Sequence, residues 1–143
     1  MLKQLKLKII TPEKTVYEDM VDSITLPTTE GEIGIFPDHI PIVSALKSGD
    51  IVASKNGEHI PFAVVGGFIE FKDNTLAVLA DFAEHVSEIS DDAVTKAKAR
   101  AEELQKMKEN GDIVDFEHFE SELERSLTRV KISDKWRSRK YRK

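Results

Sequence analysis

The stretch EGEIGIFPDHIP, residues Glu30–Pro41, carries more information about the fold than any other part of this chain. It contains two glycines, two prolines, a histidine and three isoleucines. Such a stretch is too apolar for a loop that only faces solvent, and its glycines and prolines interrupt any helix. We therefore expect a turn-rich connection between strands.

On both sides of this stretch, residues 1–86 show the pattern of short β-strands. Leu5, Leu7 and Ile9 alternate with lysines, which is the period-two signal of a strand with one buried face. Further strand-like runs follow at short intervals: Val21–Leu26, which Pro27 is expected to end, Ile40–Leu46, Ile51–Ser54, Ile60–Val65, Phe68–Phe71 and Thr75–Ala80. Many short strands at regular spacing predict a β-sandwich.

Turn signals separate these runs, namely Ser48–Asp50, Asn56-Gly57 and Asp73-Asn74. Asn56-Gly57 predicts a two-residue type I′ hairpin, because both residues tolerate a positive φ. The pair Gly66-Gly67 lies inside an apolar run and predicts either a bulge or a close approach of two backbones.

At Ser90 the periodicity becomes helical. Ser90 can cap a helix whose first turn carries two aspartates. Small and apolar residues then recur at helical spacing as far as a stop at Asn110-Gly111: Ala93, Ala97, Ala101 and Leu104. A second helix begins near Asp112 or Asp115, and its apolar stripe is Phe116, Phe119, Leu123, Leu127 and Val130. A stripe of small residues beside a bulky one predicts two close antiparallel helices.

The sequence thus predicts an N-terminal antiparallel β-sandwich, residues 1–86, followed by a C-terminal two-helix antiparallel hairpin with a basic arm, residues 87–143. A chain of 143 residues can bury a core without disulfides, and this one has no cysteine. Its N-terminus has neither the apolar segment of a signal peptide nor the arginine and serine of a transit segment. No apolar run approaches the roughly 20 residues that cross a bilayer, so we expect membrane association only through a partner.

Signatures of catalysis are weak. The sequence has no phosphate-binding glycine loop and no paired metal-ligand spacing among its four histidines. Asp81, Glu84 and His85 form the one tight cluster of titratable residues, and at the end of a strand we expect these side chains to diverge. We therefore expect no catalytic residue, no metal site and no cofactor, although a small hydrolase built on this cluster stays an alternative.

Three motifs together resemble a known family. Glu30–Pro41 is similar to the G-E-x-G-I-x-P-x-H-x-P signature of the epsilon subunit of the F-type, proton-translocating ATP synthase. Val65–Phe71 (VGGFIEF) and Leu76–Glu84 (LAVLADFAE) follow in the family's order, and the helical C-terminal third completes the match. The resemblance implies a non-catalytic subunit of the central stalk, which couples proton-driven rotation of the c ring to ATP synthesis. The alternative is a free-standing regulatory or scaffold module with a similar sandwich.

The resemblance also implies partners and contact positions. His39 matches the family histidine in a region that faces the gamma subunit, and Glu32 lies in a loop that approaches the c ring. The implied contact residues are Gly31, Glu32, Ile33, Gly34 and His39. The implied location is the cytoplasmic face of the bacterial inner membrane, peripheral and within the complex. The alternative for His39 is a loop histidine that is hydrogen-bonded to the backbone, and the alternative for Glu32 is an exposed glutamate in a turn.

The hairpin has two readings. It can pack permanently on its own sandwich, or it can open and lie on a partner, because packing and ordering terms nearly cancel in an isolated helix pair. The resemblance favours the second, in which the helices extend along the central shaft and restrain ATP hydrolysis. The residues proposed for this regulation are Ala93, Ala97, Ala101, Phe116, Leu123, Leu127, Arg125, Arg129, Lys135, Arg137 and Arg139.

The last nineteen residues form a basic arm, with nine basic side chains and one acidic. We weigh three interpretations: nucleic-acid binding, which the acidic remainder of the chain opposes, a solvated tail, and docking on the catalytic hexamer when the hairpin extends. The arm can also fold back on the chain's own helices.

Some bacterial members of this family bind ATP through a motif like I-D-x-x-R-A. Here Ser90 replaces the motif's aspartate and Ala93 replaces its arginine. Without that guanidinium a strong charge-assisted contact is missing, so we predict weak or absent ATP binding, although Arg100 and Arg125 or Arg129 could reach a nucleotide.

Overall fold

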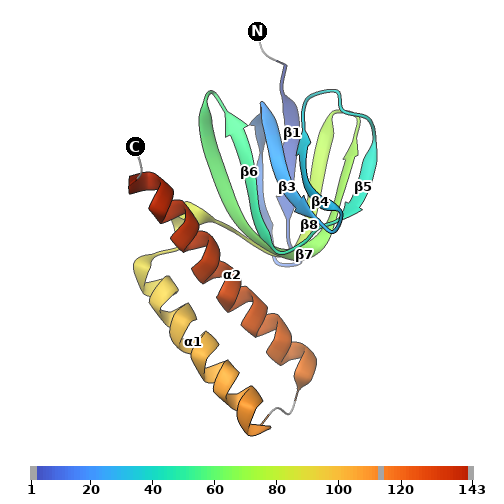
Figure 1. Cartoon of the computed structure of the whole chain (residues 1–143). Coiled ribbons are helices and arrows are strands. Elements are labelled where there is room, and N and C mark those ends of the chain that lie inside the picture. The colour runs from blue at the N-terminus through green and yellow to red at the C-terminus, as the bar shows by residue number, and fades with distance from the viewer. Residues whose placement is uncertain (1–2, 113–114, 142–143) are drawn as a thin grey trace. The chain divides into compact units, whose positions relative to one another are not determined.

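The computed structural model describes residues 3–112 and 115–141, without the side chains of residues 116 and 139–141 (Figure 1). The chain forms two compact units, Met1–His85 and Val86–Lys143. The first consists of strands and the second of helices, so the predicted fold class is confirmed.

The first unit is an open eight-stranded sheet in the order β2-β1-β8-β7-β6-β3-β4, with β5 paired to β7. The strands are β1 Leu5–Ile10, β2 Thr15–Val21, β3 Ser23–Thr28, β4 Gly31–Ile35, β5 Ile42–Ala45, β6 Gly49–Lys55, β7 Glu58–Lys72 and β8 Thr75–His85. All the strand pairs in these described residues are antiparallel except β1 with β8, which run parallel.

The core of the sandwich follows the predicted alternation. Leu5, Leu7 and Ile9 are fully buried, while the lysines between them are partly exposed. The large aromatic side chains Phe62 and Phe71 of β7 are buried in the same cluster. Burial of such side chains stabilises a fold by about 1.5–3 kcal/mol each, before the cost of ordering.

Strand β7 is one long strand rather than the two predicted runs. Gly66 and Gly67 lie within it with φ of 59° and 108°, yet its register with β8 continues from Val65–Phe82 to Gly67–Ala80 with no inserted residue. A Cβ at Gly67 would lie 2.0 Å from the carbonyl oxygen of Leu79. The expected close approach of two backbones is therefore confirmed, and there is no bulge. Before the glycines β7 pairs with β6, and after them with β5.

The hairpin turns also follow the sequence. Asn56 and Gly57 have φ of 52° and 79° and connect the paired residues Lys55 and Glu58, as a type I′ turn requires. Asp73-Asn74 forms a second two-residue turn, with φ of 51° and 56°, between β7 and β8.

Three features of the strands differ from the prediction. Pro27 does not end a strand but lies inside β3, opposite Glu32 of β4. It is tolerated there because β6 pairs only with Ser23–Thr25, so no ladder bond to β6 is lost at Pro27. The expected loop Gly31–Gly34 belongs to β4, and Thr15–Val21, which we did not predict, forms β2.

The second unit is the predicted hairpin, with η1 Val86–Glu88, α1 Asp91–Asn110 and α2 Phe116–Tyr141. Ser90 caps α1, since its hydroxyl accepts a hydrogen bond of 3.0 Å from the Ala93 amide. Gly111 ends α1 in the left-handed conformation, and the Asp115 carboxylate accepts from the His118 amide at 3.1 Å and so caps α2. A small core of Ala101, Leu104, Phe119 and Leu123 joins the helices.

Helix α2 continues through the basic arm. The apolar stripe fades beyond Val130, yet the backbone stays helical to Tyr141. Most of the arm is thus the last part of a 26-residue helix, about 39 Å long, rather than an irregular tail.

Candidate partner-binding surfaces

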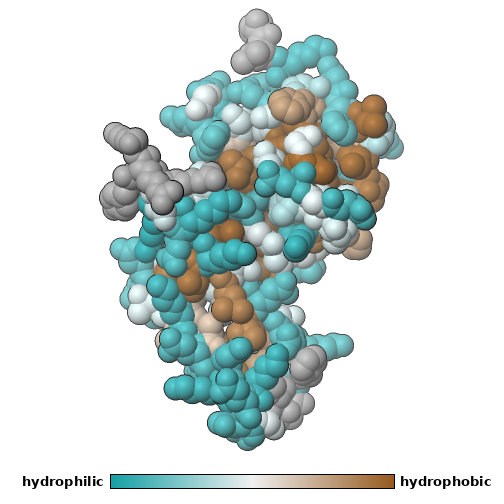
Figure 2. Space-filling view, in the orientation of Figure 1, coloured by the Kyte–Doolittle hydropathy of each residue, from teal (hydrophilic) through white to brown (hydrophobic). Residues whose placement is uncertain are grey.

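Six large apolar side chains in the described part of the sandwich are exposed. Met20 (40%) lies on β2, and we call the other five the apolar patch: Phe36 (63%), Ile40 (73%), Val43 (70%), Phe68 (60%) and Leu79 (51%). Phe36 and Ile40 come from the loop that leads into β5, and the other three from β5, β7 and β8. Figure 2 shows apolar surface gathered over this unit, on the side where Figure 1 labels β5.

Strand pairing brings part of the patch together. Phe68 lies opposite Leu79 across the β7–β8 ladder and opposite Ala45 across the β5–β7 ladder. Val43 lies two residues before Ala45 on β5 and therefore points to the same face of the sheet. An exposed apolar group of this size on a rigid sheet is typical of a surface that a protein partner covers.

The loop between β4 and β5, residues 36–41, is fixed in place by hydrogen bonds. Asp38 has a positive φ of 62°, and its amide donates to Oδ1 of Asn74 at 2.9 Å. The same Asn74 donates through Nδ2 to the carbonyl oxygen of Gln4 at 2.8 Å. Lys3 forms an exposed ion pair with Asp38 at 2.6 Å.

His39 lies in this loop, as predicted. Its Nδ1 is 2.7 Å from the carbonyl oxygen of Ile40, and its ring packs edge-on against Phe71 with 5.8 Å between centroids. These are the contacts of a structural histidine, which is half-buried and keeps part of its ring accessible.

The other predicted contact residues belong to β4 rather than to that loop. Gly31, Glu32 and Gly34 are exposed, and Ile33 is half-buried and packs against the core. Strand β4 lies at one end of the strand order and pairs with β3 alone among the described strands. Glu32 therefore stands at a sheet edge, separate in the fold from the element that carries His39.

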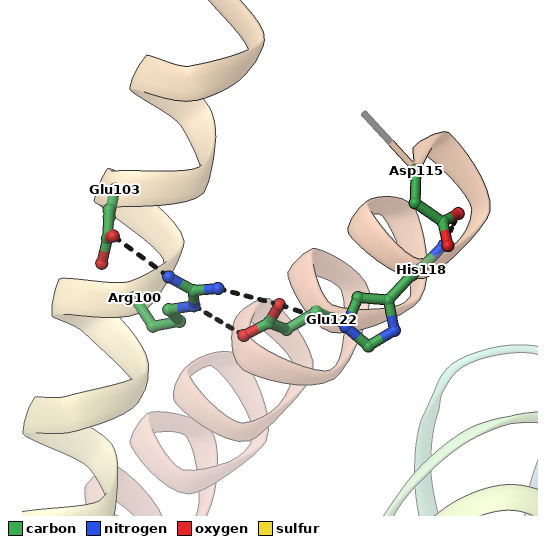
Figure 3. Close-up of polar contacts among 5 residues, drawn as sticks. All are labelled: Arg100, Glu103, Asp115, His118 and Glu122. Carbon is green, nitrogen blue, oxygen red and sulfur yellow. Dashed lines mark hydrogen bonds and ion pairs between the residues drawn. The ribbon is translucent and has the colours of Figure 1, made fainter. Parts of the chain in front are cut away.

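A charged cluster ties the two helices together at mid-length (Figure 3). The Arg100 guanidinium of α1 donates to both carboxylate oxygens of Glu122 in α2, through Nε at 2.5 Å and Nη2 at 3.1 Å. Its Nη1 is 3.1 Å from Glu103 on the same helix. These hydrogen bonds hold the pKa of Glu122 below its ordinary value and raise the pKa of Arg100. His118 lies 3.9 Å from Glu122.

Two further ion pairs join the helices near their ends. Lys108 near the end of α1 lies 3.8 Å from Glu120 near the start of α2. Arg137 near the end of α2 pairs with Asp91 at the start of α1. At least this residue of the basic arm therefore folds back on the chain's own helix.

The apolar members of the predicted regulatory set differ in their burial. Ala97, Ala101 and Leu123 are buried, and Ala93 is half-buried. Leu127 is 52% exposed, so the expected apolar stripe is not wholly covered. It lines a groove of about 420 Å³ with Ala101, Glu102, Gln105, Lys106, Glu109 and Leu123.

The basic members of the set lie on α2. Arg125 and Lys135 are exposed, and Arg129 and Arg137 are half-buried. Phe116 and Arg139 belong to α2 by their backbone, but their side chains lie outside the described residues.

The cluster Asp81, Glu84 and His85 does not form a site. All three belong to β8, in which successive side chains point to opposite faces, so Glu84 diverges from the other two. Asp81 lies beside Gly66, and His85 packs edge-on against Phe62 with 5.0 Å between centroids. Within residues 3–112 and 115–141, no three histidine or acidic side chains gather as a metal-binding group. The described helices include none that is long and apolar enough to cross a membrane.

Sequence reasoning missed Asn74 and Glu122. The sequence marks Asn74 only as a turn residue, since its side-chain partners lie 36 and 70 residues away. Glu122 was one of many glutamates in the helical segment. The geometry of an antiparallel hairpin, which sets it opposite Arg100, was the signal that could have found it.

Comparisons with known proteins agree with this arrangement. The family model for the ATP synthase delta/epsilon chain, β-sandwich domain, matches residues 4–86. Three bacterial proteins named ATP synthase epsilon chain are similar over nearly their whole lengths. That of Desulforamulus reducens is 37% identical over 94% of this chain and 100% of its own. That of Nitratidesulfovibrio vulgaris is 41% identical over 92% and 97%. That of Bacillus mycoides is 38% identical over 93% and 98%.

Solved structures show the same fold. A chain of the Euglena gracilis mitochondrial ATP synthase superposes with a TM-score of 0.62 and 19% identity, over 96% of this chain and 82% of that one. The curated relatives span both units of this chain, so the likeness is to whole epsilon chains rather than to the sandwich alone.

Proposed function

The chain belongs to the family of ATP synthase epsilon chains, and from that membership we propose that it is a non-catalytic subunit of the central stalk. In this role it couples proton-driven rotation of the c ring to ATP synthesis through the gamma subunit. The observation that carries the proposal is the exposed apolar patch on a rigid sandwich, in a chain whose titratable cluster at Asp81, Glu84 and His85 is dispersed. Such a protein acts through the surfaces that it offers to partners.

We assign the apolar patch to the gamma subunit. Covering five exposed apolar side chains removes them from water, and this is the main source of affinity in most protein interfaces. The loop with His39 adjoins the patch in sequence and contributes to the same contact. Glu32, on the edge strand β4, is assigned to the polar loops of the c ring.

Binding and crosslinking test these assignments. Val43→Ser removes the apolar side chain from an exposed position, so it should weaken binding to purified gamma subunit without lowering the melting temperature. Met20→Ser is the matched control, because Met20 is also exposed but lies on β2, outside the patch. A cysteine at Glu32 should crosslink to the c ring in native membranes, and the assignment of Glu32 fails if no such product forms.

We further propose that the C-terminal helices inhibit ATP hydrolysis when they extend onto the catalytic hexamer. The closed hairpin is held by a small core and by ion pairs that are partly exposed, and exposed pairs contribute little to stability because water and salt screen them. A partner with higher affinity for the open form could therefore shift the equilibrium. The basic arm would dock on acidic surface of the hexamer.

Truncation tests this regulatory role. Deleting Lys131–Lys143 should raise ATP hydrolysis by the assembled complex and leave assembly intact. Unchanged hydrolysis would rule out docking by the arm.

No cofactor is needed for these roles, and we propose that ATP binds weakly or not at all. Arg100, the arginine of α1, already pairs with Glu122 and Glu103. Ser90 is occupied as a helix cap. Calorimetric titration with ATP should show no affinity in the micromolar range or tighter. The proposed location is peripheral, on the cytoplasmic face of the bacterial membrane.

A further inference from the structure

The carboxamide of Asn74 connects three segments that are distant in sequence. Its Oδ1 accepts from the amide of Asp38, and its Nδ2 donates to the carbonyl oxygen of Gln4. Its own carbonyl oxygen accepts from the amide of Lys6 at 3.0 Å. One residue of the β7–β8 turn thus links the start of β1 to the loop of residues 36–41.

Few side chains other than asparagine can make both bonds. One partner is a backbone donor and the other a backbone acceptor, so the side chain must supply an acceptor and a donor on one short amide. An aspartate of the same shape would accept from Asp38 but would set a negative oxygen against the Gln4 carbonyl. The residue must also tolerate a φ of 56°, which asparagine does better than most residues.

The loop contains one residue in the left-handed conformation, which a hydrogen bond from outside the loop can hold. Asp38 has a φ of 62°, which is uncommon for a residue with a side chain. The ion pair from Lys3 adds little, since both side chains are mostly exposed. The bond from Asn74 is therefore the main polar constraint from outside the loop. Within the loop, the His39 amide donates to the Phe36 carbonyl oxygen at 3.2 Å.

The loop carries two members of the apolar patch, Phe36 and Ile40. We propose that Asn74 is a positioning residue for partner binding: it fixes residues 36–41 so that these two side chains meet the gamma subunit in one arrangement. Asn74 acts through the loop rather than by contact with the partner. The inference rests on the proposed function for the partner's identity, but the effect on the loop is independent of it.

The effect on the loop is measured in the full chain without a partner. Asn74→Gly keeps the left-handed backbone and removes the carboxamide. Hydrogen exchange at the Asp38 amide should then accelerate by about tenfold, as expected for the loss of one hydrogen bond. Asn56→Gly, in the corresponding turn between β6 and β7, is the control and should leave this amide unchanged. Unaltered exchange in Asn74→Gly overturns the positioning role.

The effect on binding is measured with purified gamma subunit by a double-mutant cycle. Asn74→Gly alone should weaken binding about five- to tenfold while the melting temperature stays near that of Asn56→Gly. If Asn74 acts through Ile40, Asn74→Gly in an Ile40→Ser background should weaken binding by no more than about twofold further. Independent, additive losses overturn the proposal. The proposal is also overturned if Asn74→Gly binds gamma subunit as tightly as the wild type although hydrogen exchange at its Asp38 amide is faster.

Two outcomes separate this inference from the proposed function. If the wild-type chain does not bind gamma subunit, the proposed partner is wrong, and the exchange experiment alone judges the role of Asn74 in the loop. If Asn74→Gly fails to fold, Asn74→Asp answers the same question. It should weaken binding at least twofold through the lost bond to Gln4, and unchanged binding overturns the proposal.

Discussion

The close approach of β7 to β8 at Gly67 gives the sharpest test of the sandwich, through the substitution Gly67→Ala. An alanine Cβ would lie 2.0 Å from the carbonyl oxygen of Leu79 and 2.9 Å from the Cα of Ala80. Both are backbone atoms of the paired strand β8, so neither can rotate away. The two strands would have to separate at the point where β7 passes from β6 to β5.

The magnitude has two parts. Holding alanine at a φ near 108° costs about 1–3 kcal/mol in backbone strain. Forcing a methyl group into occupied space costs typically about 1–3 kcal/mol more, and here the contact is with rigid backbone. We therefore expect Gly67→Ala to lower the free energy of unfolding of the sandwich by about 2–6 kcal/mol, a large part of the stability of an ordinary domain.

Gly31→Ala is the matched control. Gly31 has a φ of 115°, close to that of Gly67, but no atom lies within 4 Å of the Cβ that an alanine would add. Urea denaturation of both variants should show the loss from strain alone in Gly31→Ala and a loss larger by at least about 1 kcal/mol in Gly67→Ala. Equal losses would refute the argument that the strands approach too closely for a side chain.

Three further predictions concern the hairpin. Glu122→Gln should increase hydrogen exchange in the middle of α2, because the bidentate hydrogen bond from Arg100 becomes weaker when its acceptor loses the negative charge. Glu117→Gln on the same helix should leave the exchange unchanged. Equal exchange in the two variants contradicts the role of the ion pair. Arg100 holds the pKa of Glu122 below its ordinary value of 4.5, so the stabilisation by this pair should be complete above that value and be lost as pH falls through the lower pKa of the folded state. Hydrogen exchange in α2 of the wild type, measured relative to Glu122→Gln at the same pH, should therefore rise at acidic pH. The absence of such a rise argues against the prediction. Leu104→Ala should destabilise the hairpin by about 2–4 kcal/mol in thermal unfolding monitored by helical circular dichroism, since Leu104 is 2% exposed, whereas Leu127→Ala at a half-exposed position should cost less than about 1 kcal/mol.

The sequence predicted local features better than those set by distant neighbours. Alternation identified β1, Asn56-Gly57 identified a hairpin turn and Ser90 identified the start of α1, because each depends on residues next to one another. The prediction that Pro27 ends a strand was wrong, since whether a proline ends a strand depends on where the neighbouring strand stops. Here the neighbouring strand is β6, which is more than twenty residues away in the sequence and stops pairing with β3 at Thr25.

The candidate surfaces show the same division. The stretch Glu30–Pro41 pointed to a contact region, yet the structure divides it between an edge strand with Glu32 and a loop with His39. Exposure of Val43, Phe68 and Leu79 could not be read from the pattern, because these residues look like core residues of strands. Their exposure follows from which face of the sheet the rest of the chain leaves uncovered.

The two units differ in how firmly each is held, and this difference bears on the proposed mechanism. In the sandwich, large side chains such as Phe62, Phe71 and Leu26 are fully buried from strands that pair along their lengths. In the described part of the hairpin, the shared core contains two small or medium positions, Ala101 and Leu104, against Phe119 and Leu123. Because local opening requires less free energy where fewer apolar contacts are lost, the hairpin should open long before the sandwich unfolds. A subunit that must transmit rotation through one unit and adjust its inhibition through the other requires that order of stability, and reversal of the order in hydrogen exchange would contradict the assignment of the two roles.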